Sequence, residues 1–296
     1  MFKNFSFKKI RYLLEAPFVW LGMIFFRILP LSLASDFSAN IAKFVGKKIA
    51  VNNLAFNNLS KALPLLTKDE KMQIIDEMWD NLGRIIGEFP HVCAMSYQEL
   101  KGYVEIDEES KKNIDEIKKL NRGGIIFSAH FGNWEIGPKF LLNQGLKVST
   151  VYRPLNNPFV EKLTAKKRGV PMIEKGGAGS RQIVNALKNR EFIIIMADQK
   201  ITDGALVKFF NDDAVTATSI AKIAIKYEVP LIPGCIFRNH KKFNFSLKIE
   251  KPLEYNLGDI SDVNVLGVTL KINQKIQAWI TKSPEQWFWV HNRWKK

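Results

Sequence analysis

Residues 123–137 read GGIIFSAHFGNWEIG, and this stretch decides the fold class of the chain. The first half is a short apolar run bounded by glycines and a polar residue, which is typical of a buried strand. The second half leads into an apolar segment with the features of a helix start. His130 therefore stands at the junction of a predicted strand and a predicted helix.

The same alternation continues along the chain. Further buried strands are predicted at residues 146–152, 192–198 and 231–237, and helices between them at 156–169, 180–191 and 215–228. This order predicts an α/β fold with a mostly parallel sheet flanked by helices. Strict alternation over residues 241–255 predicts a later, antiparallel strand, and a final helix is expected from Asn264 to Thr281.

The domain organisation follows from where the pattern changes. We expect an N-terminal membrane anchor over residues 1–35 and one domain over 36–296, with a helical lead-in at 36–120 and an α/β core at 121–296. In the lead-in, apolar residues recur near the helical period of 3.6. Thr67 and Glu70 have the spacing of a capping box at a helix start.

The anchor is predicted from the apolar run at residues 16–34, which follows a basic, acid-free N-terminus. A cleaved signal peptide and a buried core helix are the alternatives. An uncleaved anchor that spans the bilayer or lies in its interface is favoured, and Pro30 is expected to end or kink its helix. We prefer a shallow or re-entrant insertion, which keeps the remainder of the chain on the cytoplasmic side.

The net charge of +15 predicts an anionic partner: nucleic acid, anionic lipid head groups or an acidic carrier protein. The chain has two cysteines, Cys93 and Cys235, in separate neighbourhoods, which gives no sign of a disulfide framework or a CxxC metal motif. This cysteine usage fits a reducing, cytosol-facing compartment.

Polar side chains follow several of the predicted strands. His130, Arg153 and Asp198 each come directly after an apolar run. Sites in open α/β sheets form beyond the carboxyl ends of the strands, so these three side chains are expected to converge.

Glu135 lies five residues after His130. With Gly132 permitting a tight bend, the carboxylate could accept a hydrogen bond from one imidazole nitrogen and leave the other free as a general base. A core histidine beside an unrelated helix-start glutamate explains the same spacing, and spacing alone leaves both interpretations open.

The motif HFGNWE at residues 130–135 resembles the HX4(D/E) signature of lysophospholipid-type acyltransferases. The whole chain resembles the branch that adds secondary acyl chains to lipid A, the Kdo-dependent lauroyl and myristoyl acyltransferases. The blocks that carry this resemblance occur in the same order: VYRPLNNP (151–158), KKRG (166–169), MADQK (196–200), FFNDDAVTATSIAKIA (209–224) and PEQWFWVHNRWK (284–295). The fourth block departs from the family by lacking its usual glycines.

The resemblance implies that a fatty acyl chain passes from acyl carrier protein to the hydroxyl of a 3-hydroxyacyl chain on a lipid A precursor. His130 would be the general base and Glu135 would orient it. Arg153, Arg168, Asp198 and Asn133 are assigned to substrate binding, although the role of Asp198 could also be catalytic or structural. Arg168 matches a position important for activity, and a bidentate guanidinium suits phosphate.

Under the same resemblance, neither a cofactor nor a metal is expected. The localisation would be the bacterial inner membrane, with the catalytic domain facing the cytoplasm. Alternatives are an acyltransferase acting on a phospholipid, glycolipid or aminolipid, a hydrolase, and a basic membrane-associated nucleic-acid-binding protein. The absence of a GxSxG motif argues against a serine esterase.

Two further stretches carry alternatives. Residues 174–182, EKGGAGSRQ, could cradle an anion through backbone N–H groups or form a plain turn with Ser180 as N-cap. The aromatic and basic tail at residues 284–296 could stack on nucleic acid, but a membrane-interface belt is preferred.

Overall fold

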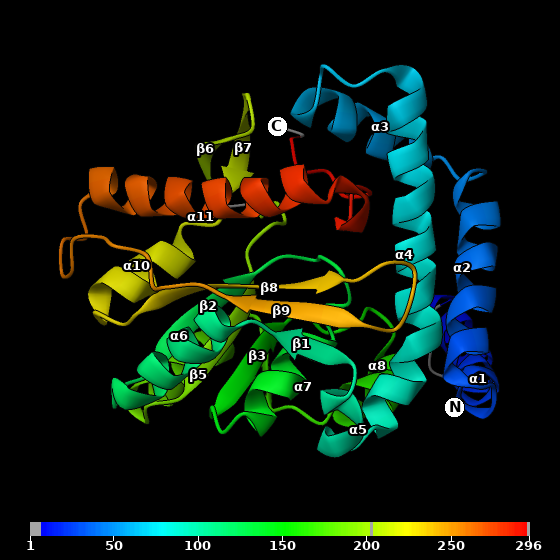
Figure 1. Cartoon of the computed structure of the whole chain (residues 1–296), viewed down its shortest axis with the longest axis horizontal. Helices are drawn as coiled ribbons and strands as arrows, with labels where there is room; N and C mark the ends of the chain where they lie inside the picture. The colour runs from blue at the N-terminus through cyan, green and yellow to red at the C-terminus, as the bar shows by residue number, and fades with distance from the viewer. Residues whose placement is uncertain (1–6, 202–203, 295–296) are drawn as a thin grey trace, which may run out of the picture.

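Seven short strands form one sheet that is mostly parallel, with helices on both faces (Figure 1). The computed structural model describes residues 7–201 and 204–294. The strands of the sheet, in chain order, are β1 (Val104–Ile106), β2 (Gly124–Ser128), β3 (Val148–Tyr152), β4 (Met172–Glu174), β5 (Phe192–Met196), β8 (Leu231–Arg238) and β9 (Phe245–Ile249). A separate hairpin consists of β6 (Ala205–Phe209) and β7 (Asp212–Thr216).

Thirteen helical segments are described around these strands. They are α1 (Phe7–Ile28), α2 (Leu31–Gly46), α3 (Val51–Ala62), α4 (Lys68–Ala94), α5 (Tyr97–Lys101), α6 (Glu108–Lys119), α7 (Ile136–Asn143), α8 (Pro158–Thr164), η1 (Ala165–Arg168), α9 (Gly177–Lys188), α10 (Ser219–Lys226), α11 (Asp262–Lys282) and η2 (Pro284–Gln286). The predicted capping box of Thr67 and Glu70 is confirmed at the start of α4.

The strand order is β1-β9-β8-β2-β5-β3-β4, and only the β8–β9 pair is antiparallel. The α/β fold with its mostly parallel sheet, predicted from the alternating pattern, is therefore confirmed, as is the antiparallel strand within residues 241–255. Strand β1 lies inside the segment where the apolar spacing predicts helices. It is only three residues long, which is too short to produce a periodic signal.

Alternation along each strand sends side chains to opposite faces and builds two cores. Ile125 and Phe127 of β2 point to one face, where they join buried residues of α4, α9, α10 and α11. Ile126 between them points to the other face and packs with residues of α5, α6 and α7. Both faces of β2 are thus covered, which explains its uninterrupted apolar sequence.

Helices α2 and α4 pack side by side at one end of the sheet, as Figure 1 shows. Glycines at two positions of α4 allow this close approach. A Cβ atom at Gly87 would lie 2.3 Å from the carbonyl oxygen of Ala34, and one at Gly83 would lie 2.5 Å from that of Ser38. A side chain at either position would force the two helices apart.

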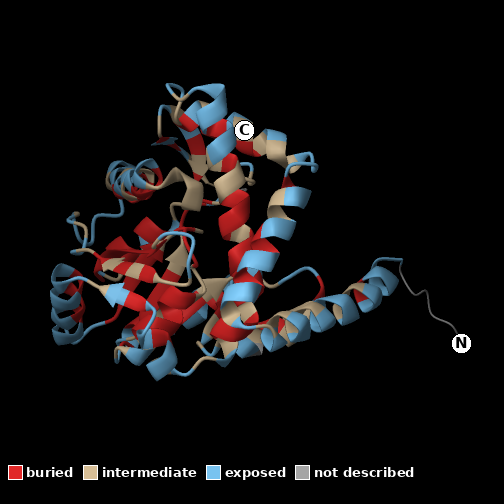
Figure 2. Cartoon of the chain, turned by 45° about the vertical axis from the view of Figure 1, so that its right-hand side comes forward, coloured by how far each residue is buried: buried red, intermediate tan, exposed pale blue. Residues whose placement is uncertain are grey.

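The N-terminal helices leave much apolar surface exposed. In Figure 2, α1 projects from the body of the molecule and most of its length is exposed. Pro30 separates α1 from α2, as the sequence predicts. Within the described part of the chain, no helix is both long and apolar enough to traverse a bilayer, and a membrane-spanning anchor in residues 1–35 is therefore not supported.

The C-terminal tail was expected to form a membrane-interface belt, and the structure corrects this expectation. Trp287 and Trp289 are fully buried, and Trp294 is nearly so. Their indole N–H groups donate to Asp198, to the carbonyl of Pro284 and to the carbonyl of Phe209, respectively. These three indoles belong to the core, so they form neither a membrane-interface belt nor a nucleic-acid stacking surface.

Substituting Gly87→Ala should destabilise the protein by about 1–3 kcal/mol, because the added methyl group overpacks the α2–α4 contact. Gly267→Ala is the matched control: Gly267 is an exposed position of α11 with nothing near the added Cβ. It should stabilise by roughly 0.5–1 kcal/mol through helix propensity. Urea unfolding of both variants measures the difference, and equal stabilities would contradict the close-packing interpretation.

Candidate active site

The pairing of β2 with β5 brings His130 and Asp198 together. Ser128 at the end of β2 lies opposite Met196 at the end of β5, and each strand continues for two residues to reach His130 and Asp198. The backbone N–H of Ala197 donates to the carbonyl of Ser128 at 2.8 Å, which extends the parallel register beyond the strands. The predicted convergence of these two side chains at the carboxyl edge of the sheet is thus confirmed.

Asp198 is fully buried and accepts hydrogen bonds from three donors. The backbone N–H of His130 lies 3.0 Å from Oδ2, the ring Nδ1 of His130 lies 2.9 Å from Oδ1, and Trp287 Nε1 lies 2.9 Å from Oδ2. Burial would raise the pKa of Asp198, but the charge and hydrogen bonds of His130 outweigh burial and hold the pKa well below 3.8. Asp198 is therefore ionised at neutral pH.

The same contact sets the state of His130. Burial lowers the pKa of the imidazole, but the attraction of Asp198, with a smaller contribution from Glu135, raises it above 6.5 overall. Because Nδ1 is held by Asp198, Nδ1 carries the proton in the neutral ring and Nε2 has a free lone pair. Within the described residues Nε2 has no hydrogen-bond partner. Such a nitrogen can accept a proton from a hydroxyl.

Glu135 forms no hydrogen bond with His130 among the described contacts, although the family resemblance implies that Glu135 orients this imidazole. Its carboxylate accepts two hydrogen bonds from Arg168, at 2.8 Å from Nε and 3.1 Å from Nη2. Glu135 occupies the N-cap position of α7 without a capping hydrogen bond from its side chain, whereas Nδ1 of His130 faces the end of β5. Glu135 thus occupies the Nε and Nη2 edge of the Arg168 guanidinium, so a phosphate expected at Arg168 would have to use the Nη1 side or displace Glu135.

The bend after His130 depends on Gly132, as predicted. Gly132 has φ +56°, and a Cβ atom there would lie 2.2 Å from the carbonyl oxygen of Ile236. Its N–H donates to the carbonyl of Gln286, and its carbonyl accepts from Asn81 Nδ2 at 3.0 Å. The backbone N–H of Phe288 donates to the carbonyl of His130 at 3.2 Å. Helix α4 and the C-terminal tail thus hold this loop from two sides.

Asn133 is part of this support, not of the substrate surface. Its side chain is fully buried and donates to Glu88 at 2.9 Å. Glu88, also fully buried, forms a bidentate ion pair with Arg238 at 2.7 and 2.9 Å. Asn133 also accepts a hydrogen bond from the backbone N–H of Glu135. Direct substrate contact, expected from its place in the motif, is closed to this side chain.

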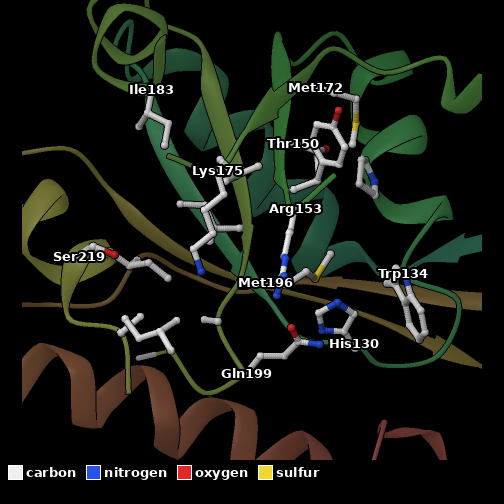
Figure 3. Close-up of a pocket in the computed structure, with 18 of the residues that line it drawn as sticks. His130, Trp134, Thr150, Arg153, Met172, Lys175, Ile183, Met196, Gln199 and Ser219 are labelled. Atoms are coloured by element: carbon white, nitrogen blue, oxygen red, sulfur yellow. The ribbon is translucent and has the colours of Figure 1, made fainter. Parts of the chain in front are cut away.

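A cavity of about 590 Å³ opens beside His130, a volume typical of small-molecule sites. Figure 3 shows His130 and Trp134 at one side and Ile183 and Ser219 at the other. The apolar part of the lining includes Val151, Ile183, Ile195, Met196, Ile220 and Ile223. The cavity therefore combines a base at one end with a wall suited to a hydrocarbon chain.

Arg153 lines the cavity, as expected of a residue after β3, and Arg168 and Glu135 line it as well. Further polar residues that the sequence did not single out also line it, among them Lys175, Gln199 and Lys200. Lys175 follows β4 and the other two follow β5. The rule that placed His130 and Arg153 at this edge of the sheet could have identified them too.

The Gly-rich stretch at 174–182 forms the start of α9, with Gly176 and not Ser180 at the N-cap position. Ser180 lies inside the helix and its hydroxyl donates to the carbonyl of Gly176. Among the described residues no group of three or more histidine, cysteine or acidic side chains is placed to hold a metal ion.

A buried carboxylate that orients a histidine beside an apolar cavity is the arrangement of an enzyme that activates a hydroxyl or water, and comparison with known proteins identifies the class. The family described as bacterial lipid A biosynthesis acyltransferase matches residues 3–296. The chain belongs to this family, and the protein is an acyltransferase.

Individual relatives are distant but extend over most of the chain. A lipid A biosynthesis acyltransferase of Haemophilus influenzae is 22% identical over 283 residues, which cover 92% of this chain and 86% of the relative. The lipid A biosynthesis palmitoleoyltransferase of Escherichia coli is 25% identical over 251 residues, which cover 82% and 78% respectively. A lipid A biosynthesis acyltransferase of Shigella flexneri has the same identity and coverage.

The pKa of His130 generates a prediction for pH dependence. A histidine that acts as a base must be neutral, so with His130 in that role the acid limb of kcat/KM is expected above pH 6.5, where activity would fall with falling pH. Asp198→Asn removes the charge that raises this pKa and leaves the burial that lowers it. The acid limb should therefore shift to lower pH, while kcat falls by about 10²–10⁴.

A pH–rate profile of wild type and Asp198→Asn measures both effects. The control is Asp115→Asn, a substitution at an exposed position of α6, which should leave the profile unchanged. An acid limb at the same pH in wild type and Asp198→Asn would contradict the coupling of the two groups.

Proposed function

We propose that the protein transfers a fatty acyl chain from the thioester of acyl carrier protein to the hydroxyl of a 3-hydroxyacyl chain on a lipid A precursor. The observation that carries this proposal is the hydrogen bond from Nδ1 of His130 to Asp198, which leaves Nε2 free beside an apolar cavity. The family and the names of its members support a lipid A precursor as acceptor.

In the proposed reaction, Nε2 of His130 removes the proton of the acceptor hydroxyl as its oxygen attacks the thioester carbonyl carbon. The imidazolium that forms is stabilised by Asp198, which acts as a positioning residue. Collapse of the tetrahedral intermediate breaks the C–S bond, and the departing sulfur takes the proton back from His130. The ester and the free thiol of the carrier are the products, and every proton is accounted for.

Arg168 and Glu135 contribute through their ion pair. The side chain of Arg168 is 21% exposed and that of Glu135 is 14% exposed. Glu135 fixes the guanidinium at the wall of the cavity. Burial lowers the pKa of Arg168, but the hydrogen bonds and charge of Glu135 raise it overall, so the cation persists. In this proposal the HX4E carboxylate anchors a cation near the reacting groups, where negative charge develops on the thioester oxygen.

We further propose that α1 and α2 bind the membrane surface without spanning it. Exposed apolar side chains line both helices, among them Leu14 and Phe18 on α1 and Phe37 and Phe44 on α2. Phe25 of α1 contacts Phe37 of α2 with ring centroids 5.7 Å apart, which joins the two sets into one surface. Lipid acceptors would then reach the catalytic domain from the cytoplasmic face of the inner membrane.

The carrier protein is the proposed second partner. The net charge of +15 would attract a strongly acidic carrier, and this advantage in association rate should fade as salt rises.

The acceptor is tested by incubating the protein with labelled acyl-carrier thioester and either a Kdo-containing lipid A precursor or a lysophospholipid. Label should enter the lipid A precursor. Label entering only the lysophospholipid would move the assignment to another acceptor, and release of free fatty acid alone would indicate a hydrolase. His130→Gln should reduce transfer about 10²–10⁴-fold, whereas His240→Gln, at an exposed position after β8, should leave it unchanged.

The membrane surface is tested with the double substitution Leu14→Glu/Phe18→Glu. Each change removes an apolar side chain worth about 1.5–3 kcal/mol when buried in lipid, so binding to phosphatidylethanolamine–phosphatidylglycerol vesicles should weaken at least tenfold in a flotation assay. The control Val263→Glu/Leu266→Glu places the same charges on exposed apolar residues of α11. Equal vesicle binding by both variants would refute the proposal.

A further inference from the structure

Three basic residues that line the cavity follow three neighbouring strands of the sheet. Strands β5, β3 and β4 are adjacent in the sheet and parallel. Lys200 follows β5, Arg153 follows β3 and Lys175 follows β4, and all three residues line the cavity beside His130. We call Arg153, Lys175 and Lys200 the basic rim. Figure 3 shows the side chains of Arg153 and Lys175 extending into the cavity toward His130 and Gln199.

No carboxylate in the described part of the chain neutralises the basic rim. None of its three residues forms a hydrogen bond or ion pair with another described side chain. By contrast, the neighbouring Arg168 is bound by Glu135, the single carboxylate among the described lining residues. Like charges that gather without a partner repel one another, so an anion that enters the cavity would be attracted there.

The chemistry of the rim favours a phosphoryl group. A guanidinium presents a planar fork of donors that matches two phosphate oxygens, and ammonium groups act as mobile point charges beside it. Gly176 and Ser180, at the start of the twelve-residue helix α9, also line the cavity. The positive end of that helix dipole adds to the potential of the cations.

We propose that the basic rim binds a phosphoryl group of a substrate while the acyl chain lies against the apolar wall. The inference rests on the proposed function and deepens it. A phosphoryl group could come from the phosphodiester of the carrier's phosphopantetheine arm or from a phosphate on the acceptor lipid. Both would place the reacting carbonyl or hydroxyl within the cavity that contains His130.

Kinetics distinguish these two sources. In Arg153→Gln and Lys175→Gln, KM for the phosphate-bearing substrate should rise roughly tenfold, since a hydrogen bond to a charged group is lost, while kcat stays within about threefold. The control Lys188→Gln removes an exposed cation from the other end of α9 and should leave both KM values unchanged.

One set of assays compares KM for acyl-phosphopantetheine with KM for acyl-pantetheine as donor. A second set compares KM for the lipid precursor with KM for its dephosphorylated form as acceptor. A rise in KM confined to the phosphorylated donor assigns the rim to the carrier's arm. A rise confined to the phosphorylated acceptor assigns it to the lipid phosphate. If Arg153→Gln and Lys175→Gln have the same KM values as Lys188→Gln in both sets of assays, the proposal is overturned.

A binding measurement separates failure of this inference from failure of the proposed function. Calorimetric titrations use 4′-phosphopantetheine against pantetheine, and N-acetylglucosamine 1-phosphate against N-acetylglucosamine. The wild-type protein should bind at least one phosphorylated probe more tightly than its unphosphorylated counterpart. The double variant Arg153→Gln/Lys175→Gln should lose that difference, and Lys188→Gln should keep it.

Absence of acyl transfer by the wild-type protein would defeat the proposed function, but the titrations would still test the rim. Absence of any preference for both phosphorylated probes would overturn the rim even if transfer occurred.

Discussion

The parallel pairing of β2 with β5 is the constraint on which the site depends. Because Ser128 lies opposite Met196, the chain reaches His130 and Asp198 at the same level beyond the sheet. The carboxylate then accepts from both the backbone and the ring of His130, and Trp287 supplies a third donor. A slip of one residue in this register would turn every side chain of one strand to the opposite face and would separate the pair.

A second set of contacts holds the loop that follows His130. The buried ion pair of Glu88 with Arg238 binds Asn133, and Asn81 binds both Gly132 and Arg238. In addition, Ser35 of α2 donates a hydrogen bond to Glu88. Helix α2 is thereby connected through buried hydrogen bonds to the loop that follows His130. A buried charge pair of this kind is costly to break, which favours a single arrangement of the loop.

The sequence pattern was sufficient to predict the sheet and the position of His130, because buried strands and strand ends leave local signals. It could not predict the partner of His130. The choice of Asp198 over Glu135 depends on which strand lies next to β2, and strand order has no local signal. The prediction for the C-terminal tail was wrong for a related reason. A segment with tryptophans beside lysines and arginines has the same composition whether it covers lipid or fills a core, and only packing distinguishes the two.

The tail contacts imply an order of assembly during synthesis. Trp287 donates to Asp198, and Phe288 donates to the carbonyl of His130, yet both residues are translated long after the strands they support. While residues 284–291 are still inside the ribosome, the nascent chain lacks one donor to Asp198 and one backbone bond to the histidine loop. The full set of hydrogen bonds around His130 and Asp198 therefore forms only as this segment emerges, when all strands of the sheet have already been translated.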